Sequence, residues 1–461
     1  GILLSSCKKK KEDIEPPVPS SDKLIVSFSF KQANNTAYLN EDASGAGAAD
    51  TLIITVPAET DISNLKPDIT IVGKSISPAS GEVKNFLSPV TYIVTAEDGS
   101  TRKYVVVVNY RSTVFFSSLD GALYALDASN GQLIWRLSNG QFHSGTPSVY
   151  KGFVYINAMD GVYAVDARKG TQKWKYAIPT SASWGGTEFF PSPVVVNDVV
   201  YIAAFDGYVY ALNSADGTLK WKTKSSSGAP FISSVTLHNN MLYAGCGDSY
   251  LYALNTASGN IAWKFNALNP IYSNPLIVGN NVCIEAYAKN CYLLNGTTGS
   301  VIWTTPGISN MSNATLADGK IFSGGGNSAS AYDSNTGVQV WSILFTPGGL
   351  IHSERSGPVI DDGKFYAGSN NGSLYAYDIA TKNRLWTFNS ITINGGYIYG
   401  SPVLADGRLY FGNNNGNMYA VSVSTGLLLW STGTSNGIYG SACVVDKKGV
   451  KHYPAISGEQ Q

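Results

Sequence analysis

Residues 193–221 read PVVVNDVVYIAAFDGYVYALNSADGTLKW, and this stretch contains the strands and turns of one repeating unit. Runs rich in Val and Tyr are separated by Asn197-Asp198, by Asp206-Gly207 and by a turn from Asn213 to Gly217. This pattern predicts four short antiparallel strands, with Asp206-Gly207 as a type I′ turn. A single sheet of this kind leaves both faces in water, so the stretch predicts one blade of a closed, radial assembly.

The same unit recurs eight times along the chain. A glycine stands four residues before seven of the repeated tryptophans, and Lys382 takes that place in the seventh copy. This regular spacing predicts an eight-bladed β-propeller of four-stranded blades over residues 111–461. Eight of the nine tryptophans, 38 to 47 residues apart, mark the copies: Trp135, Trp174, Trp221, Trp263, Trp303, Trp341, Trp386 and Trp430.

The two ends of the repeat region predict how the ring closes. The first copy begins at its second strand, Val114–Ser118, and an unused first strand, Ser441–Val445, follows the eighth tryptophan. We expect Ser441–Val445 to complete the first blade, because a closed ring removes unpaired strand edges.

The repeats also carry a family resemblance. The pattern Ala-x-Asp/Asn-x-x-x-Gly-x-x-x-Trp, as in Ala211 to Trp221, resembles the tryptophan-docking motif of quinoprotein-type propellers, with departures at Leu293, Lys382 and Ser422. The likeness covers roughly residues 111–445. WD40 propellers are the competing family, but their Gly-His and Trp-Asp signatures are missing.

That resemblance implies two classes of function. The family includes pyrroloquinoline-quinone dehydrogenases and also non-enzymatic outer-membrane assembly lipoproteins. The dehydrogenases carry an adjacent Cys-Cys pair, calcium-binding carboxylates and a catalytic aspartate. This sequence has no Cys-Cys pair, and Glu188 and Glu354 are the acidic residues that stand out near the funnel. We therefore predict no enzyme activity, no cofactor and no metal site.

Residues 23–110 predict a separate small domain. Alternating runs such as Leu24–Phe30, Thr51–Val56, Val90–Thr95 and Tyr104–Val108 indicate strands, and Asp98-Gly99 indicates a hairpin between the last two. The pattern predicts an immunoglobulin-like β-sandwich and resembles the Ig-like modules that open many bacterial surface lipoproteins. Either a spacer role or a sugar- or partner-binding role fits this domain.

Residues 1–22 predict a membrane-targeting motif followed by an extended tether. Leu4-Ser5-Ser6-Cys7 resembles the lipobox of bacterial lipoproteins, which implies lipidation at Cys7. A charged and proline-rich stretch follows, as expected for an extended linker. With no other apolar run of spanning length, the expected location is the outer membrane, lipid-anchored, on either its periplasmic or its cell-surface face.

Charge and cysteine content exclude other classes. The 32 basic and 32 acidic residues cancel, so no overall field favours nucleic acid, and the cysteines and four histidines lack zinc spacing. The four propeller cysteines are expected to be buried and free. A turn at Lys289-Asn290 would put Cys283 opposite Leu294 and Cys291 opposite Ala286, which does not pair the two cysteines.

The mouth of the funnel is the candidate binding site. Residues three positions before the expected first strands are Ser144, Phe190, Phe231, Tyr272, Met311, Arg355, Tyr399 and Tyr439. Two long inter-blade loops add Trp184 and the group His352, Glu354 and Arg355. Flat aromatic faces suit sugars or apolar peptide side chains, although the same rings also suit packing between blades. The binding residues predicted from this pattern are Trp184, Phe190, Phe231, Tyr272, Arg355, Tyr399 and Tyr439.

The sequence therefore predicts a non-enzymatic cell-envelope lipoprotein whose propeller is a binding scaffold. The expected partner is an envelope protein or a glycan at the funnel face, with no nucleic acid. A surface glycan-binding protein is the first alternative, and a quinone-dependent oxidoreductase is the second.

Overall fold

The computed structural model describes residues 18–46, 50–179, 191–287, 290–306, 313–325, 328–344, 357–369, 371–390 and 396–454. The chain divides into two compact units. The smaller unit contains Gly1–Val56 and Asp61–Asn109, and the larger contains Pro57–Thr60 and Tyr110–Gln461. In the described ranges the regular structure is β-strand, apart from one 3-10 helix, η1 (Gln32–Asn34).

The smaller unit contains seven strands that hydrogen-bond in the order β4-β1-β2-β3-β7-β6-β5. The strands bounding Asp98-Gly99 are β6 and β7, so the predicted hairpin is present. The sequence pattern missed the two shortest strands, β2 and β5. The strands are β1 (Leu24–Phe30), β2 (Ala43–Ala46), β3 (Thr51–Val56), β4 (Asp68–Val72), β5 (Ser75–Ser77), β6 (Val90–Thr95) and β7 (Thr101–Tyr110).

Aromatic packing shows that the smaller unit is a sandwich. Phe28 on β1 and Tyr92 on β6 are fully or almost fully buried, with ring centroids 5.2 Å apart, although three strands separate β1 from β6 in the hydrogen-bonded order. Two strands that are not neighbours in a sheet bring their side chains together only when the sheet faces stack. Phe30 and Phe86, at 5.0 Å, continue the same core.

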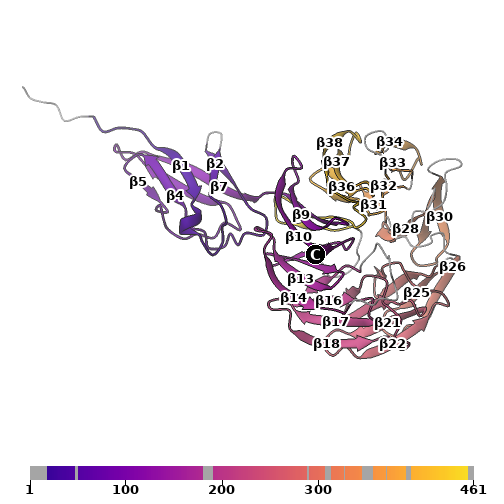
Figure 1. Ribbon diagram of the computed structural model, residues 1–461. Coiled ribbons are helices and arrows are strands. Elements are labelled where there is room, and N and C mark those ends of the chain that lie inside the picture. The colour runs from indigo at the N-terminus through magenta and orange to yellow at the C-terminus, as the bar shows by residue number, and fades with distance from the viewer. Residues whose placement is uncertain are drawn as a thin grey trace, which may run out of the picture. The chain divides into compact units, whose positions relative to one another are not determined.

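The larger unit is a ring of eight sheets that follow one another in chain order (Figure 1). The prediction of eight four-stranded blades is confirmed. Blades 1 to 4 are β39 (Cys443–Val445), β8 (Thr113–Ser118), β9 (Gly121–Asp127), β10 (Leu133–Phe142); β11 (Ser148–Tyr150), β12 (Phe153–Ala158), β13 (Gly161–Asp166), β14 (Gln172–Ala177); β15 (Val194–Val196), β16 (Val199–Ala203), β17 (Tyr208–Asn213), β18 (Leu219–Lys224); and β19 (Thr236–His238), β20 (Met241–Gly245), β21 (Tyr250–Asn255), β22 (Ile261–Asn266).

Blades 5 to 8 have the same order from the inside outward. They are β23 (Leu276–Val278), β24 (Asn281–Glu285), β25 (Asn290–Asn295), β26 (Val301–Pro306); β27 (Thr315–Ala317), β28 (Lys320–Gly325), β29 (Ser328–Asp333), β30 (Gln339–Leu344); β31 (Val359–Asp361), β32 (Lys364–Gly368), β33 (Ser373–Asp378), β34 (Arg384–Asn389); and β35 (Val403–Ala405), β36 (Arg408–Gly412), β37 (Asn417–Ser422), β38 (Leu428–Gly433).

The repeated tryptophans join each blade to the next. Every indole Nε1 donates a hydrogen bond of 2.8 to 3.1 Å to a backbone carbonyl of the following blade, and Trp430 of blade 8 donates to blade 1. The repeated glycine of the following blade lies against the indole, where a Cβ atom would stand only 2.5 to 2.7 Å from the ring. The glycine spacing in the sequence therefore reflects close packing between blades as well as a turn.

The C-terminal strand closes the ring as predicted. Cys443 lies opposite Phe115, so β39 pairs with β8 and completes blade 1. The chain continues into β40 (Lys451–His452), which pairs with β39. The hydroxyl of Tyr453 then donates to the carbonyl of Val149 in blade 2 and accepts from its N–H. The C-terminal segment thus joins blades 1 and 2 together.

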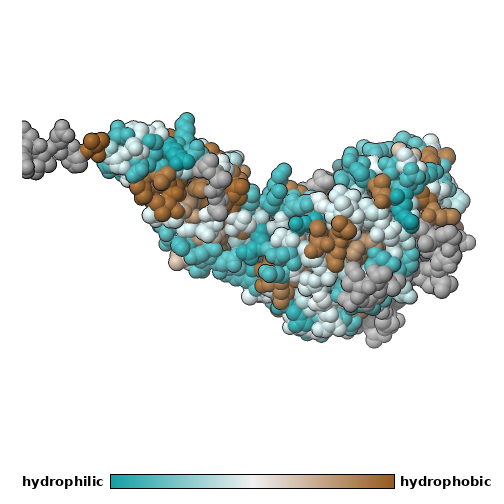
Figure 2. Space-filling model, turned by 90° about the horizontal axis from the view of Figure 1, so that it is seen from above, coloured by the Kyte–Doolittle hydropathy of each residue, from teal (hydrophilic) through white to brown (hydrophobic). Residues whose placement is uncertain are grey.

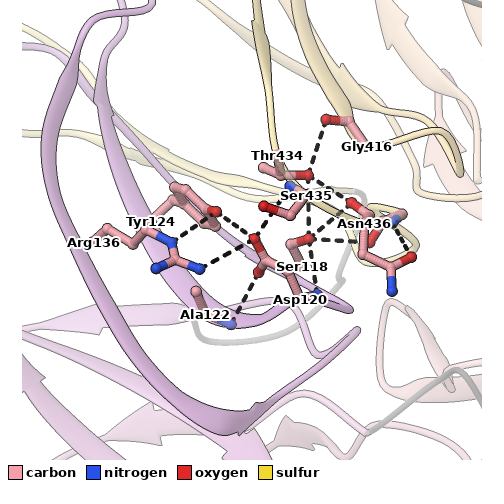
Figure 3. Close-up of polar contacts among 10 residues, drawn as sticks. Ser118, Asp120, Ala122, Tyr124, Arg136, Gly416, Thr434, Ser435 and Asn436 are labelled. Carbon is pink, nitrogen blue, oxygen red and sulfur yellow. Dashed lines mark hydrogen bonds and ion pairs between the residues drawn. The ribbon is translucent and has the colours of Figure 1, made fainter.

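Polar contacts reinforce the seam between blades 1 and 8 (Figure 3). The hydroxyl of Ser118 donates to the carbonyl of Asn436 at 2.9 Å, and the carboxylate of Asp120 accepts from the Ser435 N–H. Tyr124 and Arg136 donate to that same carboxylate from within blade 1. Residues more than three hundred positions apart therefore fix the junction at which the ring closes.

Two local expectations were wrong. The type I′ turn lies at Asn197-Asp198, where both residues have positive φ, whereas at the second turn Gly207 alone does. There the carboxylate of Asp206 binds the Tyr208 N–H and the Tyr210 hydroxyl, which favours a longer loop ending in a left-handed glycine.

The predicted cross-strand partners of Cys283 and Cys291 are also wrong by one residue. Cys283 lies opposite Leu293, and Cys291 lies opposite Glu285, so both thiols share one face with their sulfur atoms 3.3 Å apart. The four described cysteines are buried and free, as expected. Burial raises the pKa of the Cys246 thiol to about 12, which keeps it protonated and unreactive.

Candidate functional site

A circlet of hydrogen bonds holds the centre of the ring in place. We call the four residues before the first strand of each blade its lead-in segment. The circlet is formed by the residues two positions before that strand. There, backbone N–H groups donate to side-chain oxygens of the next blade at 2.7 to 3.1 Å. Six such bonds connect Thr146 to Ser192, Ser192 to Ser234, Ser234 to Asn274, Asn274 to Asn313, Gly357 to Ser401, and Ser401 to Ser441.

The lead-in segments of seven blades surround one pocket on the ring axis. The space, including its open mouth, measures about 480 Å³. The described residues of its lining are uncharged: hydroxyl and amide side chains, three tyrosines, one isoleucine, a proline and two glycines. The lining residues are Ser144, Thr146, Pro191, Ser192, Ile232, Ser234, Tyr272, Asn274, Asn313, Tyr399, Gly400, Tyr439, Gly440 and Ser441.

Three of the predicted binding residues meet in this axial pocket. Tyr399 and Tyr439, from neighbouring lead-in segments, stack with ring centroids 5.0 Å apart and an interplanar angle of 9°. Tyr272 also lines the pocket and packs edge-on against Tyr287 at 5.6 Å. All three pocket tyrosines are half-buried, so each keeps part of its ring exposed.

One residue of the predicted set lies elsewhere. Phe231 is 0% exposed, packs edge-on against Tyr252 and belongs to a core cluster of blades 3 and 4. The neighbouring Ile232, 6% exposed, lines the pocket instead. The sequence alignment placed the start of this copy at Ser234, whereas the hydrogen-bonded circlet makes Ser234 equivalent to Ser192 and Asn274 and moves the register by one residue.

Trp184, Phe190 and Arg355 lie outside the described residues, as do Met311, His352, Glu188, Glu354 and Cys7. Sequence reasoning missed the serines and asparagines of the circlet. Their signal is a hydroxyl or amide residue just before the proline or alanine that precedes the first strand in most copies, which is recognisable once the tryptophan register has aligned the repeats.

Ser144 is a buried serine in the lining of the pocket. It is 4% exposed, and its Oγ has no hydrogen-bond partner among the described residues. A buried hydroxyl without a partner costs free energy, so it marks a place where another polar group completes the site.

Several titratable groups outside the pocket make structural contacts. Asp120 at the blade seam binds Tyr124 and Arg136 (Figure 3), and burial together with the bond to Asp120 raises the pKa of the Tyr124 hydroxyl. Similar Asp–Tyr contacts occur at Asp160, Asp206 and Asp248 in blades 2, 3 and 4. A pair repeated from blade to blade supports the hairpin turns and is not a catalytic constellation.

The described part of the chain contains no cluster of three or more His, Cys, Asp or Glu side chains placed to hold a metal ion. It also contains no helix long and apolar enough to cross a membrane.

The outer edges of the blades differ around the ring. The edge strands of blades 2, 3 and 4 carry six exposed lysines and no acidic residue, a composition that discourages pairing with other strands. The edges of blades 5 and 8 expose apolar residues such as Ile302 and Leu428. Figure 2 shows apolar side chains in several separate patches on the face seen from above.

Comparison with known proteins agrees with this architecture. The protein family described as outer membrane protein assembly factor BamB matches residues 92–229, 120–342 and 206–432. The family described as SGBP, N-terminal, matches residues 25–108. The crystal structure of BamB from Moraxella catarrhalis has a TM-score of 0.52 at 16% identity, covering 68% of this chain and 91% of that one, which is a likeness of fold.

Two curated relatives show different functions. The chain is 25% identical over 293 residues to outer membrane protein assembly factor BamB of Moranella endobia, covering 58% of this chain and 72% of that protein. It is 28% identical over 326 residues to the tetrathionate hydrolase of Acidithiobacillus ferrooxidans, covering 60% of this chain and 55% of that enzyme. The chain thus spans about half the length of the hydrolase. Because the assembly-factor profile matches well over half of its residues, the chain belongs to the outer membrane protein assembly factor BamB family.

Proposed function

We propose that this protein is a non-enzymatic binding scaffold of the bacterial cell envelope, with its binding face at the axial pocket. The observation that carries the proposal is the convergence of seven lead-in segments, which supply Tyr272, Tyr399 and Tyr439, on one pocket whose described lining is uncharged. Aromatic side chains that keep part of their rings exposed at a concave site suit contact with a partner molecule.

The chemistry of the pocket supports binding rather than catalysis. Acid–base and nucleophilic mechanisms need titratable groups within hydrogen-bond reach of a reacting atom. The described lining supplies hydroxyl and amide groups, with no carboxylate, imidazole, thiol or ammonium among them. Family membership favours a partner in outer-membrane protein assembly, because that is the function named for the family.

Site-specific photo-crosslinking in intact envelopes tests the proposal. A photoreactive residue at Tyr399 should crosslink a discrete partner, whereas one at Lys220, on the outer edge of blade 3, should not. Crosslinking of the same partner from Lys220 with equal yield, or none from Tyr399 and Tyr272, would contradict the placement of the binding face.

We also propose that Cys7 carries the lipid anchor. The motif before it in the sequence and the membership of an outer-membrane assembly family support this proposal. A precursor carrying Cys7→Ser should leave the membrane fraction and fail to incorporate labelled palmitate. Retention of the variant in membranes would refute the lipid anchor while leaving the binding scaffold untouched.

A second candidate function is glycan binding at the cell surface. The match of residues 25–108 to the SGBP N-terminal family and the pocket tyrosines favour it.

A further inference from the structure

We infer that the axial pocket binds one uncharged sugar ring, held by hydroxyl and amide donors on its floor and by the tyrosine pair at its wall. The inference rests on the proposed function, since it takes the pocket face as the binding face. It names the ligand chemistry, which neither the family nor the relatives specify for this pocket.

The first step concerns the donors of the circlet. Ser192, Ser234 and Ser441 each accept a backbone N–H through Oγ, which fixes the position of the oxygen. A hydroxyl that accepts one bond still has its own proton to donate. No acceptor for these three protons occurs among the described residues.

The amide of Asn274 follows the same logic. Its Oδ1 accepts the Ser234 N–H, so the amide is held with a known orientation and its Nδ2 group retains two donors. The floor of the pocket therefore presents several fixed donors side by side. A ligand that satisfies them needs several oxygen acceptors on one face, as the hydroxyl oxygens of a sugar ring provide.

The second step concerns Ser144. Its buried and unpartnered Oγ lines the same pocket and offers one donor and two acceptor positions. A sugar hydroxyl is both donor and acceptor and can use either capacity. Binding of such a group removes the cost of the unsatisfied Ser144 hydroxyl.

The third step concerns shape and charge. The nearly parallel rings of Tyr399 and Tyr439, with Tyr272 on the same lining, provide aromatic surface for the C–H face of a pyranose. The described lining carries no positive charge to neutralise an acid and no negative charge to hold an amine. The pocket therefore favours a neutral sugar over a uronate, a sulfated sugar or an amino sugar with a free ammonium.

Isothermal titration of the full chain with short neutral oligosaccharides, beside matched uronate and sulfated ones, tests the inference. We expect a neutral oligosaccharide to bind. Ser144→Ala should weaken it about fivefold through loss of one hydrogen bond, and Tyr439→Ala about tenfold through loss of ring contact. Ser144→Ala should not lower the melting temperature, because its buried hydroxyl has no partner among the described residues.

Matched controls are Ser424→Ala, an exposed serine in an outer turn of blade 8, and Tyr208→Ala, a half-buried tyrosine outside the pocket. Both should retain the sugar affinity. Three results would overturn the inference: binding of acidic oligosaccharides alone, equal affinity in Ser144→Ala and Tyr439→Ala, or no neutral sugar binding below a Kd of about 10 mM. If the Tyr399 crosslink to an envelope protein persists in those cases, the scaffold proposal stands and the sugar ligand does not.

Discussion

The indole Nε1 of Trp430 in blade 8 donates a hydrogen bond of 3.0 Å to the carbonyl oxygen of Ala128 in blade 1, across 302 positions of sequence. The Tyr410 hydroxyl and the Arg408 guanidinium donate to the same oxygen. The seven other repeated tryptophans make the same hydrogen bond to the following blade. The bond from Trp430 lies where the two ends of the ring meet.

Replacing Trp430 should separate packing from hydrogen bonding at the seam. Trp430→Ala should lower the free energy of unfolding by about 3–5 kcal/mol, because a large buried ring leaves a cavity. Trp430→Phe, which keeps an aromatic ring but leaves the Ala128 carbonyl one donor short, should cost markedly less. Urea unfolding measures both. Equal losses in the two variants would show that the ring area contributes little.

Lys382 offers a stabilising substitution. It takes the place of the repeated glycine and has a φ of 61°, which strains a residue with a Cβ atom. Lys382→Gly should raise stability by about 1 kcal/mol, since glycine adopts this conformation freely. The reverse test is Gly337→Ala, whose Cβ would stand 2.7 Å from the Trp303 ring and should destabilise the blade. Thermal melts that move both variants in one direction would contradict this reasoning.

Deleting residues 438–461 should open the ring. The truncation removes β39, exposes the edge of β8 and deletes the Tyr453 hydroxyl that binds Val149. An unpaired inner edge invites pairing with other chains, so we expect lower solubility and a lower melting temperature. Gel filtration and melting of the truncated chain check this, and a monomer that melts like the parent would refute the closure argument.

Trp184 remains a prediction from sequence, since it lies outside the described residues. It has no place in the tryptophan register and stands between small residues, Ser181 to Ser183 and Gly185-Gly186. Trp184→Ala should therefore leave the melting temperature nearly unchanged and weaken ligand or partner binding. Trp221→Ala is the matched comparison, because Trp221 donates to Thr256 and packs between blades. A Trp184 variant that unfolds as readily, or one that binds normally, would each contradict the prediction.

His143 should make stability depend on pH. Burial lowers its pKa below the ordinary value of 6.5, so the unfolded chain binds the proton more readily than the folded one. Its contribution is complete above pH 6.5 and is lost as the pH falls from there through the lower folded pKa. The stability difference between the parent and His143→Gln should therefore shift over that acidic window. A difference that stays constant with pH would exclude this role.

The repeat architecture was predictable because its signals are local. A glycine four residues before a tryptophan, Asp-Gly and Asn-Asp turns, and runs such as Val199–Ala203 depend on backbone conformation and short-range packing, so they are visible within one copy. The closure by Ser441–Val445 was predictable because the first copy lacks its first strand and one extra first strand follows the eighth tryptophan. The one-residue error at Phe231 arose where a copy lacks the proline that marks the first strand in several others.

The sequence by itself determined the all-β class, the number of blades and the strand that closes the ring, because hydrophobic alternation and turn residues specify each blade separately. Only the tertiary structure decided that Ile232 rather than Phe231 faces the axis, that the Ser144 hydroxyl has no partner among the described residues, and that Tyr399 and Tyr439 stack. These outcomes depend on contacts between blades. A side chain two or three residues before a strand turns to the core or to the axis according to the position of the neighbouring blade, which no single repeat encodes.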